Sequence, residues 1–217
     1  IGMTGLVGAR TLIAADFLPL LNGVDIVTLA QESLGYATRI ENDARCFVLA
    51  ETRFGAARGA RDVVGITLGT GAGGGVIVDG ILHRGAHANA GEIWSLPLRD
   101  KWLEYFVSTT GLVQGFQKAG GQEENVDAAR IAALARAGNA AALTAFHSYG
   151  ADVAMACETI RALLDPEVIV IGGSIAQAHD VFGDEFQRRI AKLEPRIAWA
   201  ELGAAAGVIG AASLGMA

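Results

Sequence analysis

GITLGTGAGGGVIVDGILHRGAHANAG, from Gly65 to Gly91, contains three apolar runs separated by a glycine cluster and by an Asp79-Gly80 pair. We predict three strands here, the last two joined by a type I′ turn at Asp79-Gly80. Clustered glycines let backbone N–H groups approach an anion closely, because glycine has no Cβ and accepts positive φ. The pattern therefore favours a phosphate-holding hairpin, and the alternative is a tight glycine hairpin that binds nothing.

Strands and helices alternate on both sides of this stretch. The three strands are expected at 63–68, 75–78 and 81–84, and a buried strand follows Pro166 and closes at Gly172-Gly173. Further strands are expected at 36–41 and 196–201, and helices at 26–34, 44–54, 102–117, 127–137, 139–164, 178–193 and 204–214. This order predicts an α/β fold with a mostly parallel sheet, to which the three-stranded meander adds an antiparallel part.

The composition excludes several classes of function. The 217 residues include 17 basic and 23 acidic side chains, and the net charge of −6 predicts no surface for nucleic acid or for an anionic membrane. Apolar stretches are interrupted before they reach the roughly 18 residues of a membrane span, and no signal-peptide pattern is found. Cys46 and Cys157 lie far apart and outside any metal-ligand spacing. They are expected to be buried thiols of a cytoplasmic protein.

Asp43 is the first candidate for chemistry. It follows Asn42 at the expected end of strand 36–41, directly before helix 44–54. An aspartate held there can accept a proton from a substrate hydroxyl, and the alternative role is a plain helix cap. The glycine-and-threonine loop and the Gly172-Gly173 pair favour the first role. A base together with loops that hold phosphates suits phosphoryl transfer, in which the protein mainly positions the reacting groups.

The glycine cluster matches neither of the two common nucleotide motifs. No Gly-Lys-Ser or Gly-Lys-Thr follows it, as a Walker A loop requires. The glycines also precede a strand rather than a helix, unlike a dinucleotide-binding fingerprint. Both common nucleotide folds are therefore disfavoured.

Short motifs follow one another along nearly the whole chain. They are Asn42-Asp43-Ala44 with Glu51, Leu68-Gly69-Thr70-Gly71-x-Gly73-Gly74-Gly75, Asp79-Gly80, Arg84-Gly85, Ala90-Gly91-Glu92-Ile93, Ile171-Gly172-Gly173 and Ala206-Gly207-x-Ile209-Gly210-Ala211-Ala212. Together they resemble the ROK family of repressors, open reading frames and kinases, which belongs to the actin-like sugar kinases. The resemblance implies two ribonuclease-H-like lobes with an active site in the cleft between them.

The resemblance also implies a sugar-binding side of that cleft. Asp43 matches the general base that takes the proton from the sugar hydroxyl, and Asn42 matches a sugar-binding amide. Glu92 matches a carboxylate that accepts hydrogen bonds from the ring hydroxyls, and Glu104 matches a further sugar-binding glutamate. Many family members carry a histidine where Ser95 stands here. The Ser95 hydroxyl could partly replace its contact with the sugar, so we expect a changed sugar preference.

A nucleotide-binding side is implied in the same way. Gly69, Thr70 and Gly71 match the second phosphate loop, and Gly172 and Gly173 match the glycines beside the adenosine. We therefore expect ATP and Mg²⁺ as cofactors and, from the same resemblance, a homodimer.

A structural zinc is not expected. In many family members the histidine at the position of Ser95 also binds a zinc ion whose other ligands are three closely spaced cysteines. Here the cysteine loop is absent, Trp102 stands near the position of the last cysteine, and neither cysteine of the chain is nearby. No metal-binding residue is therefore predicted.

The resemblance divides the chain into two lobes. Residues 1–43 and 203–217 would belong to the small N-terminal lobe, and residues 44–202 would form the large C-terminal lobe. The family's first phosphate motif, Asp-x-Gly-Gly-Thr, is not found, and Met3-Thr4-Gly5-Leu6-Val7 resembles a later strand and turn of the first lobe. We therefore expect the first lobe to be truncated at its N-terminus.

Two functions of different classes remain open. The first is ATP-dependent phosphorylation of a hexose or an N-acetylated hexosamine, with Asp43 as the general base. The alternative is the sugar-sensing effector domain of a ROK-family transcriptional repressor, and a catalytically dead fragment is a third possibility. Loss of the zinc pattern favours the repressor, because some such regulators also lack it, whereas retention of Asp43 favours the kinase.

Overall fold

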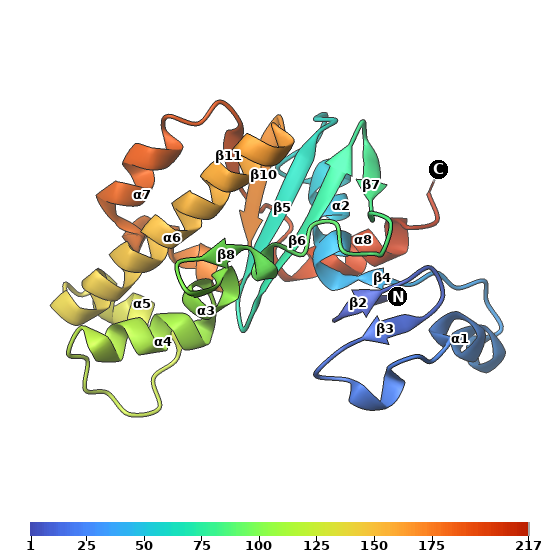
Figure 1. Cartoon of the computed structure of the whole chain (residues 1–217), viewed down its shortest axis with the longest axis horizontal. Helices are drawn as coiled ribbons and strands as arrows, with labels where there is room; N and C mark the ends of the chain where they lie inside the picture. Colours follow the sequence, from blue (N-terminus) through green and yellow to red (C-terminus); the bar gives the residue numbers. More distant parts are fainter. Residues whose placement is uncertain (217) are drawn as a thin grey trace.

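A five-stranded sheet organises the larger part of the chain in the computed structural model, which describes residues 1–216 (Figure 1). The strands lie in the order β11 (Arg196–Trp199), β10 (Val168–Gly172), β5 (Val63–Leu68), β6 (Ala72–Val78) and β7 (Ile81–His83). β10 pairs in parallel with β11 and β5, whereas β5, β6 and β7 form the predicted antiparallel meander. The α/β fold is confirmed. The prediction of a mostly parallel sheet was too strong, because parallel and antiparallel pairings occur equally often in it.

The register of the meander separates the glycine cluster into two parts. Leu68 pairs with Ala72 and Gly65 pairs with Gly75, so the turn between β5 and β6 consists of residues 69–71 and the remaining glycines lie within β6. The predicted type I′ turn between β6 and β7 is confirmed by the positive φ angles of Asp79 (52°) and Gly80 (79°).

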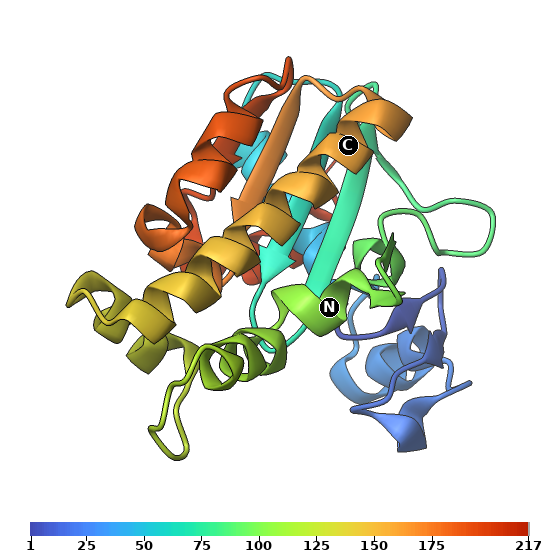
Figure 2. The ribbon, with the colours of Figure 1, turned by 60° about the vertical axis from the view of Figure 1, so that its left-hand side comes forward.

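Helices cover both faces of this sheet (Figures 1 and 2). α2 (Asp43–Phe54) and α8 (Ala206–Ser213) lie on one face, where Phe47, Val48 and Ala206 join the sheet in one core. The other face is covered by α3 (Leu103–Val107), α4 (Thr109–Lys118), α5 (Ala128–Arg136), α6 (Ala140–Leu164) and α7 (Gly183–Ile190). Burial of apolar side chains on both faces explains why the central strands β5 and β10 are continuous apolar runs.

The first 42 residues form a smaller unit beside the sheet, at the right of Figure 1. It contains β1 (Gly2–Met3), β2 (Leu6–Val7), β3 (Leu12–Ala14), a 3₁₀ turn (Pro19–Leu21), α1 (Ile26–Leu34) and β4 (Glu41–Asn42). β1 pairs in parallel with β4, and β2 pairs antiparallel with β3. Its own apolar core consists of Val7, Leu12, Ala15, Ile26, Val27 and Ile40. We call this unit the small lobe and the remainder the large lobe.

Three predicted elements differ from the structure. The strand predicted at 36–41 is only β4 (Glu41–Asn42), because β1 pairs with these two residues alone. The helix predicted at 102–117 is two helices, because extended Ser108 interrupts it and caps α4 by accepting a hydrogen bond from the Gly111 N–H. The helix predicted at 178–193 is a 3₁₀ segment, Ile175–Val181, followed by α7, and Gly183 separates them with a φ of 85°.

The remaining short elements lie in the connections. They are two 3₁₀ turns, Ile93–Ser95 and Gly203–Ala205, and a hairpin of β8 (Pro97–Leu98) and β9 (Lys101–Trp102). Cys46 and Cys157 are free and buried, as expected, and burial raises the pKa of each thiol to about 12. Among the described helices, not one combines the length and the apolar character needed to cross a membrane.

Candidate active site

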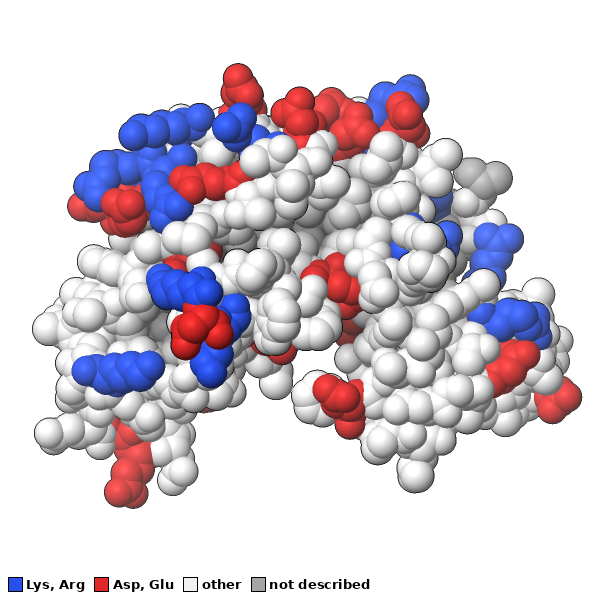
Figure 3. Space-filling model, viewed as in Figure 1, with Lys and Arg blue, Asp and Glu red and all other residues white. Residues whose placement is uncertain are grey.

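A cleft with a volume of about 630 Å³ separates the small lobe from the sheet and α2. Acidic atoms are visible in the indentation between the lobes in Figure 3. The small lobe contributes Thr4, Gly5, Leu6, Ala14, Ala15, Asp16 and Phe17 to its lining. The opposite wall consists of Asn42, Asp43, Ala44, the residues 67–74, Asn89, Glu92, Trp94, Glu104 and Gly173. Segments far apart in sequence thus converge on one cavity.

Most of the residues predicted as site residues line this cleft. They are Asn42, Asp43, Glu92, Glu104, Gly69, Thr70, Gly71 and Gly173. Ser95 and Gly172 are not among the lining residues. The Ser95 hydroxyl donates to the Glu92 carbonyl oxygen at 2.8 Å, and a Cβ at Gly172 would lie 2.6 Å from ring atoms of Phe47. Ser95 is therefore engaged in its own turn, and Gly172 permits close packing of β10 against α2.

Asp43 is the first residue of α2, and its side chain is not used as the helix cap. Asn42 holds that position, because its Oδ1 accepts a hydrogen bond from the Arg45 N–H at 3.1 Å. Asn42 also donates from Nδ2 to the carbonyl oxygen of Gly5 at 3.0 Å, which ties α2 to the small lobe. Asp43 is exposed, and its Oδ1 accepts only from the neighbouring Ala44 N–H, at 2.9 Å. An exposed carboxylate at a helix N-terminus, in a cleft, has an oxygen free to accept a proton.

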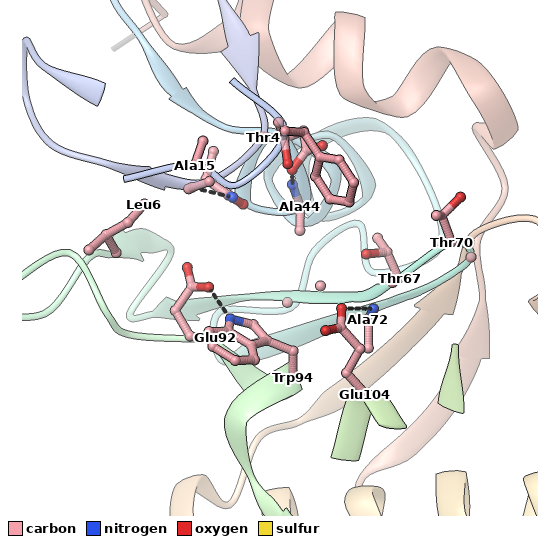
Figure 4. Close-up of a pocket in the computed structure, with 18 of the residues that line it drawn as sticks. Thr4, Leu6, Ala15, Ala44, Thr67, Thr70, Ala72, Glu92, Trp94 and Glu104 are labelled. Atoms are coloured by element: carbon pink, nitrogen blue, oxygen red, sulfur yellow. Dashed lines mark hydrogen bonds between the residues drawn. The ribbon is translucent and has the colours of Figure 1, made fainter. Parts of the chain in front are cut away.

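The carboxylate of Glu92 is held on both of its oxygens. Oε1 lies 3.3 Å from Nη2 of Arg45, and Oε2 accepts a hydrogen bond from Nε1 of Trp94 at 2.6 Å (Figure 4). Burial raises the pKa of Glu92 and the negative charge of Asp43 raises it further, whereas the hydrogen bond from Trp94 and the positive charge of Arg45 lower it. The result is an oriented carboxylate that can accept additional hydrogen bonds from hydroxyl groups.

A buried ion-pair network lies beneath Glu92, and the sequence analysis did not identify it. The Arg45 side chain is fully buried and lies 3.2 Å from Oε1 of Glu41, whose Oε2 accepts from Nε of Arg84 at 2.6 Å. Arg45 also donates to the carbonyl oxygens of Ala88 and Ala90, in the loop that leads to Glu92. The i,i+4 spacing of Glu41 and Arg45 was the available signal, but Glu41 was expected to be a plain strand residue.

The turn between β5 and β6 forms the other end of the cleft. Figure 4 shows Glu92 and Trp94 at one end and Thr70 at the other, with Thr67 and Glu104 between them. A Cβ at Gly71 would lie 2.3 Å from Oε1 of Glu104, which already accepts a hydrogen bond from the Ala72 N–H at 3.1 Å. Gly69 and Gly71 carry no side chains that would shield the backbone N–H groups of Thr70 and Gly71, and accessible N–H groups are what an anion site requires.

The glycines within β6 serve helix packing rather than anion binding. Gly73 and Gly75 lie in β6, where a Cβ would be 2.8 Å from Cβ of Ala44 and 2.6 Å from Cγ1 of Val48, respectively. They allow α2 to approach the sheet closely, and α2 carries Asp43 at its end. At the end of the neighbouring parallel strand β10, Gly173 has a φ of 93° and lines the cleft. The glycine cluster therefore combines an accessible turn with a helix-packing surface.

Among residues 1–216, no three His, Cys, Asp or Glu side chains form a group that could hold a metal ion.

Comparison with known proteins adds to this geometry. A model described as "ROK family" matches residues 1–217. N-acetylgalactosamine kinase AgaK of Shewanella sp. (strain ANA-3) is 32% identical, over 99% of this chain and 77% of that kinase. The bifunctional enzyme NanE/NanK of Brucella suis biovar 1 (strain 1330) is 36% identical over 84% of this chain, which spans 35% of that longer enzyme.

The fold is also found among solved structures. A ROK family glucokinase from Streptomyces griseus, in complex with glucose and AMPPNP, superposes with a TM-score of 0.86 at 24% identity. The match covers 98% of this chain and 79% of that glucokinase. At this identity the likeness concerns the fold, and it confirms the predicted architecture of two lobes around a cleft.

Proposed function

Because the chain belongs to the ROK family, as its motifs indicated, we propose that it is an ATP-dependent kinase of a hexose or an N-acetylated hexosamine. The single observation that carries the proposal is the position of Asp43. Asn42 caps α2, and the carboxylate of Asp43 remains exposed in the same cavity as a fixed Glu92. The N-acetylgalactosamine kinase that resembles the chain supports an amino sugar among the candidate substrates.

Asp43 acts as the general base in this proposal. The sugar hydroxyl donates a hydrogen bond to the Asp43 carboxylate, which takes the proton as the hydroxyl oxygen forms its bond to phosphorus. ATP supplies the transferred phosphoryl group, and ADP leaves as its bond to that phosphorus breaks. Glu92 and Asn42 bind the sugar, and Glu104 on α3 is a further sugar-binding carboxylate. Ser95 supports the Glu92 loop, because its hydroxyl donates to the backbone carbonyl oxygen of Glu92. Positioning by these groups and proton acceptance by Asp43 are the chain's contribution.

The residues at the other end of the cleft fit the phosphates of ATP. Gly69, Thr70 and Gly71 line the cleft, and a Cβ at Gly71 would meet Glu104. The Gly69 N–H donates to the Gly71 carbonyl oxygen at 3.0 Å, so the backbone amides of Thr70 and Gly71 are the ones proposed to bind the phosphates. Gly173 lines it too, and a Cβ there would lie 2.2 Å from the Leu68 carbonyl oxygen, while Gly172 maintains the packing beneath it. Magnesium is proposed from the family alone, and no residue of this chain is assigned to it.

From the family pattern we propose a division that differs from the two units described above, with residues 1–43 and 203–217 in an N-terminal lobe and residues 44–202 in a C-terminal lobe. In the structure α8 packs on α2 and also approaches β1, where a Cβ at Gly2 would lie 3.7 Å from Cβ of Ala211, so it contacts both of these lobes. Cytoplasmic location and a homodimer are proposed on the same family basis.

The decisive experiment measures ADP release with glucose, N-acetylglucosamine, N-acetylgalactosamine and N-acetylmannosamine. Asp43→Asn should lower kcat for the preferred sugar by about 10²- to 10⁴-fold, because it removes the proton acceptor and keeps the shape of the side chain. Asp184→Asn is the matched control, since Asp184 is an exposed first-turn aspartate of α7 far from the cleft, and it should retain full activity.

Two results would contradict the proposal. Equal rates for the protein and Asp43→Asn would remove Asp43 from the role of base. Sugar binding without ADP release, measured by calorimetry on the same panel, would instead support the sugar-sensing domain of a repressor.

A further inference from the structure

Trp94 is a large aromatic side chain that faces the cleft. It lies in the 3₁₀ turn Ile93–Ser95, where Ile93 is buried and the Ser95 hydroxyl is bonded to a backbone carbonyl. Trp94 is therefore the one side chain of this turn that lines the cavity, and 39% of its surface is exposed. Neither its position in sequence nor the family motif pointed to it.

The indole group does more than fill space. Its Nε1 donates to Oε2 of Glu92 at 2.6 Å, while the buried guanidinium of Arg45 holds Oε1 at 3.3 Å. Arg45 is itself held by Glu41, so the side of Glu92 that faces the protein interior is fixed. Each carboxylate oxygen has one protein donor and retains capacity to accept another hydrogen bond. The pair of donors thus fixes the plane of the carboxylate and leaves its open side to the cleft.

We propose that Trp94 is the sugar-selecting residue of the cleft. Its indole N–H orients Glu92 toward two neighbouring hydroxyls of a pyranose, and its exposed ring covers the less polar C–H face of that sugar. The inference rests on the proposed sugar kinase function and adds a specificity residue to it. An aromatic ring suits this task, because it presents a large rigid apolar surface and a polar edge at once.

The two parts of this role are separable by substitution. Trp94→Phe keeps an aromatic ring and removes the N–H donor, whereas Trp94→Leu removes both. Trp102→Phe is the matched control, since Trp102 is an exposed tryptophan of β9 outside the lining of the cleft. Circular dichroism and thermal unfolding of each variant establish that it is folded.

Sugar affinity is the first measurement. Calorimetry without nucleotide, using glucose, N-acetylglucosamine and N-acetylgalactosamine, should show about a 10-fold higher Kd for Trp94→Phe, because a Glu92 carboxylate that is no longer oriented loses about one charge-assisted hydrogen bond to the sugar. Trp94→Leu should weaken binding by about a further 10-fold, because the ring contact is lost as well. In the kinase assay KM should rise by similar factors, and kcat should change little, since Asp43 is intact.

The second measurement is the pH dependence of kcat/KM, which a merely structural role would not move. The charged groups around Glu92 are Arg45 and Asp43 from α2, with Glu41 and Arg84 behind Arg45. The bond from Trp94 lowers the pKa of Glu92, so its removal raises that pKa. If sugar binding needs ionised Glu92, the acidic limb of the profile moves to higher pH in Trp94→Phe and stays in place in Trp102→Phe.

The outcomes separate this inference from the proposed function. Wild-type affinity of folded Trp94→Phe and Trp94→Leu for every sugar would overturn the role of Trp94 and leave the kinase intact. If the wild-type protein binds none of the sugars, the kinase proposal fails, and an NMR titration of the Glu92 carboxyl still tests whether the Trp94 N–H holds that carboxylate. An unchanged Glu92 titration in Trp94→Phe would overturn this role of Trp94.

Discussion

Gly71 illustrates how a single missing side chain determines what a turn can do. The position lies at the end of the turn between β5 and β6, and the atom nearest to a Cβ added there would be Oε1 of Glu104. That oxygen accepts the Ala72 N–H, so the turn and α3 are joined at this point. Any larger residue at position 71 would displace the Glu104 carboxylate and break its hydrogen bond with the Ala72 N–H.

Gly71→Val should therefore reduce nucleotide affinity more than it reduces stability. Its Cβ would meet Glu104 at 2.3 Å, and displacing that carboxylate sacrifices a hydrogen bond worth about 1 kcal/mol. Added bulk at the mouth of the anion site should weaken binding of ATP by about 10-fold or more, a loss of about 1.4 kcal/mol. Calorimetry with ATP and urea denaturation measure the two effects separately.

Glu104→Ala provides the control for this prediction. In that background the valine meets no carboxylate, so the stability cost of Gly71→Val should shrink, as expected for residues in direct contact. A folded Gly71→Val protein with unchanged ATP affinity would show that the turn does not hold the phosphates.

At the scale of elements, the sequence predicted what depends on local patterns. α1, α5 and α6 begin after Asp25, Asp127 and Asn139, whose side chains accept N–H bonds in the first turn. The meander followed from its apolar runs and its turn glycines. The break at Ser108 was missed, because an apolar helical pattern continues through it and only tertiary contacts show that the chain bends there.

The glycines of β6 were interpreted from the same local pattern, and only part of that interpretation holds. Gly73, Gly74 and Gly75 looked like members of the phosphate loop. The pairing of β5 with β6 places them in a strand that faces α2 on one side and the Gly91 loop on the other. A strand–helix contact depends on register across distant residues, which the sequence pattern does not specify.

Gly75→Ala tests this packing role. The new Cβ would lie 2.6 Å from Cγ1 of Val48 and 3.1 Å from Cα of Arg45, so α2 must shift away from β6. Overpacking of this kind costs about 1–3 kcal/mol of unfolding free energy, measured by urea denaturation. Because α2 carries Asp43, kcat should fall too.

Gly207→Ala is the matched control on α8. Among residues 1–216, no atom outside its own helix turn lies within 4 Å of the Cβ it would add, and alanine favours a helix over glycine by up to about 1 kcal/mol. It should leave stability unchanged or raise it. Equal stability of Gly75→Ala and the wild-type protein would mean that α2 is not held at the distance imposed by β6.

At the scale of the whole molecule, the site depends on two lobes and on a network that joins them. Asp43, Glu92 and the turn were predictable because each lies in a recognisable motif. The roles of Trp94, Arg45 and Glu41 were not predicted, because they arise only when the loop before Glu92 folds onto α2. The i,i+4 spacing of Glu41 and Arg45 is compatible with their ion pair, but the contacts of both with the Glu92 loop depend on tertiary structure, and no spacing along the chain specifies those.

The small lobe should be the less stable part of this assembly. Its core is limited to a few apolar side chains from β2, β3 and α1, and the loop that faces the cleft leaves Phe17 78% and Leu20 93% exposed. Asn42, where β4 passes into α2, donates from Nδ2 to the Gly5 carbonyl oxygen and so ties the β1–β2 connection to the start of α2. Regions with few buried contacts open at lower free energy than the surrounding fold.

Hydrogen exchange measured by mass spectrometry should therefore show faster exchange in β2, β3 and α1 than in β5 and β10. A bound sugar that contacts both walls of the cleft should slow the small lobe selectively, since binding stabilises the closed arrangement.

Asn42→Asp separates the capping role of this residue from its bond to Gly5, because aspartate still caps α2 but cannot donate to the Gly5 carbonyl oxygen. It should accelerate exchange in the small lobe and leave β5 and β10 unchanged. Equal protection of the small lobe and the central strands, with or without sugar, would show that the two lobes open as one unit.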